Sequence, residues 1–293
     1  MRTTSRRGLL SLAAAFGVAG LTTAGAGVVT LRSQGSAGAS GPGDSAARAR
    51  PSPTPSPTPD RVARTKVALE RFVRDNGGRV SVALHDGVTG AGLAVGTRRF
   101  RTASIVKVDI LAALLLEDDT LTSTQRALAT EMITVSDNDA ASRLFRTVGG
   151  VSGLNEANTT FGMKETKANS AWGVTTTTAA DQVRLLRSIT ADGGPLSTAA
   201  ARFVLGLMGQ VVEEQRWGVP AAASPTASGV WVKNGWVQVS ADEGLWVVNS
   251  IGRITEDGHD WLVAVLSDHH ATQEKGIEIV EQAATTALRS MRA

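Results

Sequence analysis

The apolar stretch at residues 102–116 constrains the fold of this chain more than any other feature. It reads TASIVKVDILAALLL and is apolar on nearly every side of a helical projection, which predicts a helix buried through the middle of a domain. Ser104 opens this helix, and Lys107 follows three residues later on the same helical face. Burial makes a charged amine costly and lowers its pKa, so Lys107 is suited to accept a proton from Ser104.

This pair of residues is a weak signal by itself. A serine three residues before a lysine is expected about once by chance in a chain of this length. A serine that caps the helix and a lysine that extends its amine to solvent are the alternative interpretation, which the pair alone leaves open.

The positive charge of the chain lies in its N-terminal part. The net charge is +3, the first 60 residues carry +4, and residues 61–293 are therefore close to neutral at −1. We expect no nucleic-acid partner, because the larger part of the chain has no basic surplus.

The composition also excludes several chemistries. The chain has no cysteine and no tyrosine, so thiol nucleophiles, disulfides, cysteine-based zinc sites and a tyrosine base are excluded. Only four histidines are present and none lies in an H-E-x-x-H motif, so we predict neither a metal site nor a cofactor. A G-x-S-x-G turn is also absent, which argues against a serine hydrolase built on that turn.

Residues 1–31 predict an export signal of the twin-arginine (Tat) type. Arg6 and Arg7 precede a mildly apolar run, and residues 24–26 offer a small-residue cleavage site. An uncleaved membrane anchor is the alternative, because the run is nearly long enough to span a bilayer. Its content of Gly, Ala and Thr favours cleavage. We therefore expect an exported protein, extracellular or on the outer side of the cell envelope, that contacts a membrane only if the signal is retained.

Residues 32–59 form a linker rich in Pro, Ser and Gly that ends in alternating prolines. This pattern forbids a helix and favours an extended polyproline stalk, with a disordered tether as the alternative.

The remaining residues, 60–293, predict one α+β domain. Two early strands, a helical middle, three late strands and a last helix are most simply arranged as one five-stranded antiparallel sheet flanked by helices. The expected helices cover residues 60–75, 122–133, 138–148, 178–189, 198–214 and 272–291, and the expected strands cover residues 79–85, 92–95, 229–238, 243–254 and 260–266.

Two further segments carry candidate site residues. Ser136 and Asn138 lie at a polar break between two helices, where a hydroxyl can relay a proton and an amide can hold a substrate carbonyl, although the sequence SDND is also suited to capping a helix. Lys233 lies on a strand, followed by Gly235 where something approaches the backbone and by Trp236, whose N–H can face an oxyanion. A protective lysine on an edge strand is the alternative.

Three motifs in this order, S-x-x-K, S-D-N and K-x-G, resemble class A β-lactamases and penicillin-binding serine peptidases. The resemblance covers residues 60–293 and implies a helical subdomain beside the sheet, with the active site in the cleft between them. We expect a monomer, and the resemblance implies that its substrate is a small β-lactam or a cell-wall peptide. The roles it implies are Ser104 as acylated nucleophile, Lys107 as base, Ser136 as proton relay, Asn138 as a substrate-positioning residue, Lys233 and Asn234 as carboxylate-binding residues, and Gly235 and Trp236 as the strand that completes the oxyanion hole.

The chain departs from the family pattern in two places. Asn234 stands where a hydroxyl residue is usual. Glu165 and Asn169 have the spacing of the loop that activates the deacylating water in class A β-lactamases, but the loop is several residues too short. We therefore expect that Ser104 is acylated and that hydrolysis of the acyl-enzyme is slow. A D-Ala-D-Ala peptidase and a non-catalytic module that binds the cell wall remain the alternatives.

Overall fold

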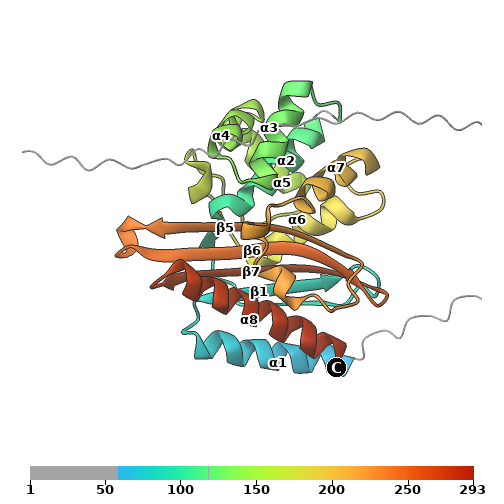
Figure 1. Cartoon of the computed structure of the whole chain (residues 1–293), viewed down its shortest axis with the longest axis vertical. Helices are drawn as coiled ribbons and strands as arrows, with labels where there is room; N and C mark the ends of the chain where they lie inside the picture. Colours follow the sequence, from blue (N-terminus) through green and yellow to red (C-terminus); the bar gives the residue numbers. More distant parts are fainter. Residues whose placement is uncertain (1–58, 118) are drawn as a thin grey trace, which may run out of the picture. The chain divides into compact units, whose positions relative to one another are not determined.

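The computed structural model describes residues 59–117 and 119–293, and the predicted export signal and residues 32–58 of the linker lie outside them. The described residues contain the predicted five-stranded antiparallel sheet (Figure 1). Its strands, in spatial order, are β2 (Gly92–Val95), β1 (Val80–Asp86), β7 (His259–His270), β6 (Leu245–Glu256) and β5 (Gly229–Val239). The two N-terminal strands thus join the three C-terminal strands through the pairing of β1 with β7.

Alternating side chains of the central strand β7 enter two different cores. Trp261, Val263 and Val265 pack with the helices α1 (Pro59–Asp75) and α8 (Gln273–Arg292) on one face. Leu262, Ala264 and Leu266 pack on the other face, which α6 (Ala179–Thr190) contacts. This period of two is what a strand buried on both faces requires.

The helix predicted at residues 102–116 is the centre of a helical subdomain on the α6 side of the sheet (Figure 1). A short 3-10 turn, η1 (Ala103–Ile105), leads into α2 (Val106–Glu117), and residues 106–115 of α2 are all buried. Four helices contact α2, namely α3 (Ser123–Thr134), α4 (Asn138–Thr147), α5 (Gly150–Thr160) and α7 (Thr198–Met208). A helix surrounded on all sides can be apolar on all sides, which is the pattern of the sequence.

The structure differs from the predicted elements in three places. Helix α5 was not predicted, because two glycines and several Thr and Asn residues lower its helix propensity. The predicted helix at 198–214 ends at Met208, next to Gly209. A second, two-stranded sheet pairs β3 (Phe100–Arg101) with β4 (Thr176–Thr177), and strands of two residues leave no periodicity in a sequence.

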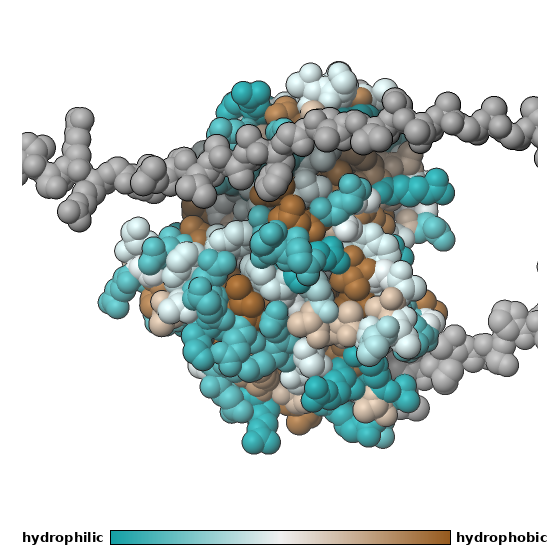
Figure 2. All heavy atoms as spheres, in the orientation of Figure 1, coloured by the Kyte–Doolittle hydropathy of each residue, from teal (hydrophilic) through white to brown (hydrophobic). Residues whose placement is uncertain are grey.

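Hydrophilic side chains cover most of the face of the described residues that Figure 2 shows, with apolar side chains at scattered positions. Within residues 59–117 and 119–293, none of the helices has both the length and the apolar character needed to cross a membrane.

Candidate active site

Ser104 lies in the η1 turn, at the place where the helical subdomain meets the sheet. Its side chain is half-buried, and among the described residues its hydroxyl has no hydrogen-bonding partner. The preceding residue, Ala103, has φ +46°, a left-handed conformation that costs a residue with a Cβ about 1–2 kcal/mol. The tight turn directs Ser104 towards a cavity whose lining it joins.

Gly235 of β5 lies against this turn. A Cβ at position 235 would stand 2.7 Å from the main-chain nitrogen of Ser104, 2.7 Å from the carbonyl oxygen of Thr102 and 2.8 Å from the nitrogen of Ile105. Only glycine permits this approach of strand to turn. The main chain of β5 and the main chain around Ser104 are therefore in direct contact, as the prediction of a close backbone approach at Gly235 requires.

Lys107 is fully buried one turn after Ser104. Its amine donates to the main-chain oxygen of Ser136 at 2.6 Å, to Asn138 Oδ1 at 2.8 Å and to Ser136 Oγ at 3.0 Å. Burial lowers the pKa of Lys107 to about 8, and the charge of Asp137 opposes this shift. Because this pKa is close to neutral pH, the amine can both accept and release a proton at that pH. We call Ser104, Lys107, Ser136 and Asn138 the cleft cluster.

The segment between α3 and α4 both caps a helix and contributes side chains to the site, and different residues do each. Asp137 caps α4, since its side chain accepts from the main-chain nitrogen of Ala140 at 2.7 Å. Ser136 has φ +61° and Asn138 begins the helix, so their side chains face Lys107. Capping by one residue thereby fixes the position of its two neighbours.

Lys233 is also fully buried, and its amine donates to the carbonyl oxygen of Asn234 at 3.2 Å. Burial first, and then the charge of Lys107, lower the pKa of Lys233 to about 7. The alternative of a protective lysine on an edge strand is wrong in one respect, because β5 is an edge strand but Lys233 lies inside the protein.

Asn234 is placed differently from its predicted role. Its amide nitrogen donates to the carbonyl oxygens of Gln215 and Trp217, both at 2.8 Å, and its buried Oδ1 has no partner among the described residues. Neighbouring residues of a strand point to opposite faces, so Asn234 turns away from Lys233 and ties β5 to residues 215–217. In this arrangement its amide nitrogen is not available to a substrate carboxylate.

A cavity of about 320 Å³ opens beside Ser104. Most of its lining comes from residues 171–174 and residues 236–237, and the walls are mainly apolar. Its lining residues are Arg101, Ala103, Ser104, Asn138, Ala171, Trp172, Gly173, Val174, Trp236 and Val237. None of these described residues is a carboxylic acid.

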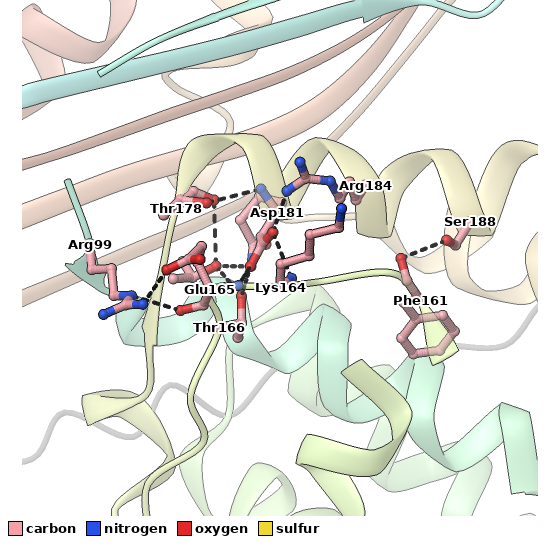
Figure 3. Close-up of polar contacts among 11 residues, drawn as sticks. Arg99, Phe161, Lys164, Glu165, Thr166, Thr178, Asp181, Arg184 and Ser188 are labelled. Carbon is pink, nitrogen blue, oxygen red and sulfur yellow. Dashed lines mark hydrogen bonds and ion pairs between the residues drawn. The ribbon is translucent and has the colours of Figure 1, made fainter. Parts of the chain in front are cut away.

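Glu165 does not reach this cavity. Its carboxylate forms an ion pair with Arg99, whose Nε also donates to the main-chain oxygen of Glu165 at 3.0 Å (Figure 3). Asn169 likewise serves its own loop, since its side-chain oxygen accepts from the nitrogen of Ala171 at 2.9 Å. The spacing of Glu165 and Asn169 therefore does not reproduce the water-activating site of class A β-lactamases.

Asp181 fastens the base of this loop. Its buried carboxylate accepts from the main-chain nitrogens of Lys164 and Glu165, at 3.0 and 2.7 Å, and from Thr166 Oγ1 at 2.8 Å (Figure 3). Arg184 adds an ion pair at 2.6 Å. We call Lys164, Glu165, Thr166, Asp181 and Arg184 the loop anchor.

Trp172 occupies the tip of the anchored loop and had not been predicted as a site residue. Lys107 Nζ lies 5.0 Å from the centroid of its ring, a cation–π distance, and its indole nitrogen donates to Ser142 Oγ at 3.1 Å. An aromatic ring thus covers the side of the amine that faces the loop. The sequence carries no motif around Trp172 that would have indicated this contact.

This chain is similar in fold to several solved structures. The solved structures with similar folds include PBP-A with a leucine-to-glutamate substitution, an acyl-enzyme complex with penicillin G (21% identity, 78% of this chain and 97% of that chain covered, TM-score 0.68). They also include a serine-to-glycine variant of the TLA-1 extended-spectrum β-lactamase (17% identity, 79% and 99% covered, TM-score 0.69). A third is a double mutant of the class A β-lactamase of the last common ancestor of Gram-negative bacteria, bound to the transition-state analogue 5(6)-nitrobenzotriazole (22% identity, 78% and 99% covered, TM-score 0.66).

The TM-scores establish the fold, which is the predicted sheet with a helical subdomain. No curated protein sequence matches the chain. A family model described as "Beta-lactamase enzyme family" matches residues 116–291, more than half of the sequence. The matched region contains Ser136, Asn138 and Lys233 and begins after Lys107. The chain belongs to the β-lactamase enzyme family.

Proposed function

We propose that this protein is an exported serine hydrolase that β-lactams or related amides acylate at Ser104, and that it releases the acyl group slowly. One observation carries the proposal, namely that Lys107, held by Ser136 and Asn138, lies one turn from a serine that lines a cavity. The predicted twin-arginine signal supports export.

Acylation uses groups of this chain at each step. Ser104 Oγ attacks the amide carbonyl carbon while its proton passes to the neutral amine of Lys107. The main-chain N–H groups of Ser104 and Trp236 stabilise the oxyanion. Ser136 then gives its proton to the leaving nitrogen as the C–N bond breaks, and the proton on Lys107 restores the hydroxyl of Ser136. An ester at Ser104 and a protonated nitrogen result.

Release of the acyl group requires an activated water molecule. The residues that line the cavity include no carboxylic acid, Glu165 is paired with Arg99, and the ring of Trp172 covers Lys107. Lack of a general base typically slows such a step by about 10²- to 10⁴-fold. These contacts support a long-lived acyl-enzyme, and with it the alternative of a penicillin-binding peptidase that acts on D-Ala-D-Ala peptides.

Intact-mass measurement after mixing the purified chain with benzylpenicillin tests the proposal. We expect a one-to-one adduct that decays slowly, and no adduct in Ser104→Ala. Ser152→Ala, which alters an exposed serine of α5, should form the adduct normally. Rapid turnover would contradict slow release. A complete lack of adducts with β-lactams and with D-Ala-D-Ala peptide donors would overturn the enzymatic proposal and favour a non-catalytic module that binds the cell wall.

A further inference from the structure

One segment carries three arginines with different surroundings. Arg98 is ion-paired with Asp268 at 2.8 Å, and Arg99 is ion-paired with Glu165. Arg101, in β3, lines the cavity beside Ser104, and within the described residues its side chain has neither a hydrogen bond nor an ion pair. Two of the three cations are thus neutralised within the protein, and the third is free at the cavity.

The main chain of Arg101 is firmly placed. Arg101 of β3 pairs with Thr176 of β4. The carbonyl oxygen of Arg101 accepts a hydrogen bond from Asn249 Nδ2 at 2.8 Å. Among the described residues that line the cavity, Arg101 is the only charged one. The cavity therefore attracts anions, and no carboxylic acid in its lining opposes that attraction.

The lining also shows in which direction the cavity extends. It includes Trp236 and Val237 but neither Lys233 nor Ser136. Ser136, which serves the leaving nitrogen under the proposed function, does not line the cavity, although Asn138 does, so we take the cavity to receive the side of the substrate opposite the leaving group. The part of a substrate that enters it is the acyl part, which stays on Ser104 after the C–N bond breaks.

We infer that Arg101 binds an anionic group on the acyl part of the substrate, so that acyl donors with a carboxylate on their acyl side chain are the preferred class. This inference rests on the proposed function. A guanidinium group matches a carboxylate with two parallel hydrogen bonds. Val174 and Val237 add apolar surface to the cavity, against which the rest of the acyl side chain can pack.

Two penicillins that differ in one group provide the test. Carbenicillin has the nucleus and phenyl side chain of benzylpenicillin and one additional carboxylate on the acyl side chain. The second-order rate of adduct formation is measured by intact mass for both compounds, with the purified chain and with Arg101→Gln, Arg101→Lys and Arg98→Gln. The preference is the carbenicillin rate divided by the benzylpenicillin rate.

We expect Arg101→Gln to lower this preference by about tenfold to a hundredfold, the range of a hydrogen bond to a charged group. Arg101→Lys should retain part of the preference, and Arg98→Gln should retain all of it. A rise in salt concentration should reduce the preference of the unaltered chain. The lysine variant also reports on the charge if the glutamine variant does not fold.

Other outcomes overturn the inference in distinguishable ways. If both penicillins acylate Ser104 and Arg101→Gln slows them equally, Arg101 contacts the carboxylate common to both, or acts on the turn, and the inference is wrong. If the unaltered chain acylates with no preference, it is also wrong. If neither penicillin forms an adduct, the proposed function itself fails and the inference fails with it.

Discussion

The cleft cluster and the loop anchor are two groups of polar residues that flank the start of α2 and use their hydrogen-bonding capacity differently. In the loop anchor, Asp181 accepts two main-chain and two side-chain contacts, which occupies both of its oxygens. In the cleft cluster, Lys107 donates to three acceptors, but Ser104 beside it has no partner among the described residues.

This difference separates a structural role from a chemical one. A carboxylate whose partners are all internal positions a loop, and its loss should reduce stability. A lysine with a lowered pKa, one turn from an unbonded hydroxyl, is proposed to supply chemistry, and its loss should reduce activity.

The largest expected effect is on activity. Lys107→Met removes the base and retains an unbranched side chain of similar length, so acylation of Ser104 by benzylpenicillin should slow by about 10²- to 10⁴-fold. The melting temperature should change little, because the variant also removes a buried charge. Rapid-quench mass spectrometry measures the first quantity, and a large loss of stability with normal acylation would reverse the assignment.

The pH dependence of the same rate follows from the pKa of Lys107. The amine must be neutral to accept a proton, and its pKa is about 8. The acylation rate should therefore rise about tenfold per pH unit below pH 8 and level off above it. A rate that is flat between pH 6 and about 9 would show that Lys107 is not the base.

Loss of the loop anchor should have the opposite signature. Asp181→Ala leaves two main-chain N–H groups and one hydroxyl without their acceptor, so we expect a loss of about 3 kcal/mol in the free energy of unfolding by urea. Asp192→Ala, at an exposed aspartate just after α6, is the matched control and should lose under about 0.5 kcal/mol. Equal losses in both variants would show that the anchor is not structural.

Asp109 of α2 sharpens the comparison, because it is a buried aspartate without the contacts of Asp181. Neither of its oxygens has a hydrogen-bonding partner within the described part of the chain, and burial raises its pKa to about 8. Between its unfolded pKa near 4 and this value the folded state binds the additional proton, so Asp109 makes the free energy of unfolding fall as pH rises.

Asp109→Asn removes this titration. Urea unfolding at pH 5 and at pH 8 should show that the variant gains stability relative to the unaltered chain at the higher pH, by more than about 1 kcal/mol. A difference that does not depend on pH would mean that Asp109 is ionised in the folded protein.

The smallest expected effect concerns Glu165. Its half-exposed ion pair with Arg99 is worth under about 1 kcal/mol, and the carboxylate does not line the cavity. Glu165→Gln should leave the decay rate of the acyl-enzyme unchanged, as followed by intact mass. A large fall in that rate would identify Glu165 as the base for deacylation.

The sequence was informative where local pattern and spatial position coincide. Alternating or apolar runs predicted the five strands, and the order of three motifs placed Lys107, Ser136 and Asn138 in one predicted active site, where the structure brings them into contact. Strand alternation implies that the side chains of Asn234 and Lys233 point to opposite faces. The carbonyl partners of Asn234, in residues 215–217, lie in an irregular segment whose position no sequence pattern predicts. The ion pair of Arg99 with Glu165 and the contact of Trp172 with Lys107 join distant positions, so only the folded chain reveals them.

The contact at Gly235 has a consequence for how this site can vary. The two N–H groups proposed to hold the oxyanion belong to the main chains of the turn and of β5, and these main chains touch with no side chain between them. The distance between the two donors is therefore independent of most substitutions around the cavity. Substitutions of side chains such as Arg101 and Trp172 can therefore alter substrate choice and the lifetime of the acyl-enzyme. The main-chain geometry proposed to activate the carbonyl stays the same as long as position 235 remains glycine.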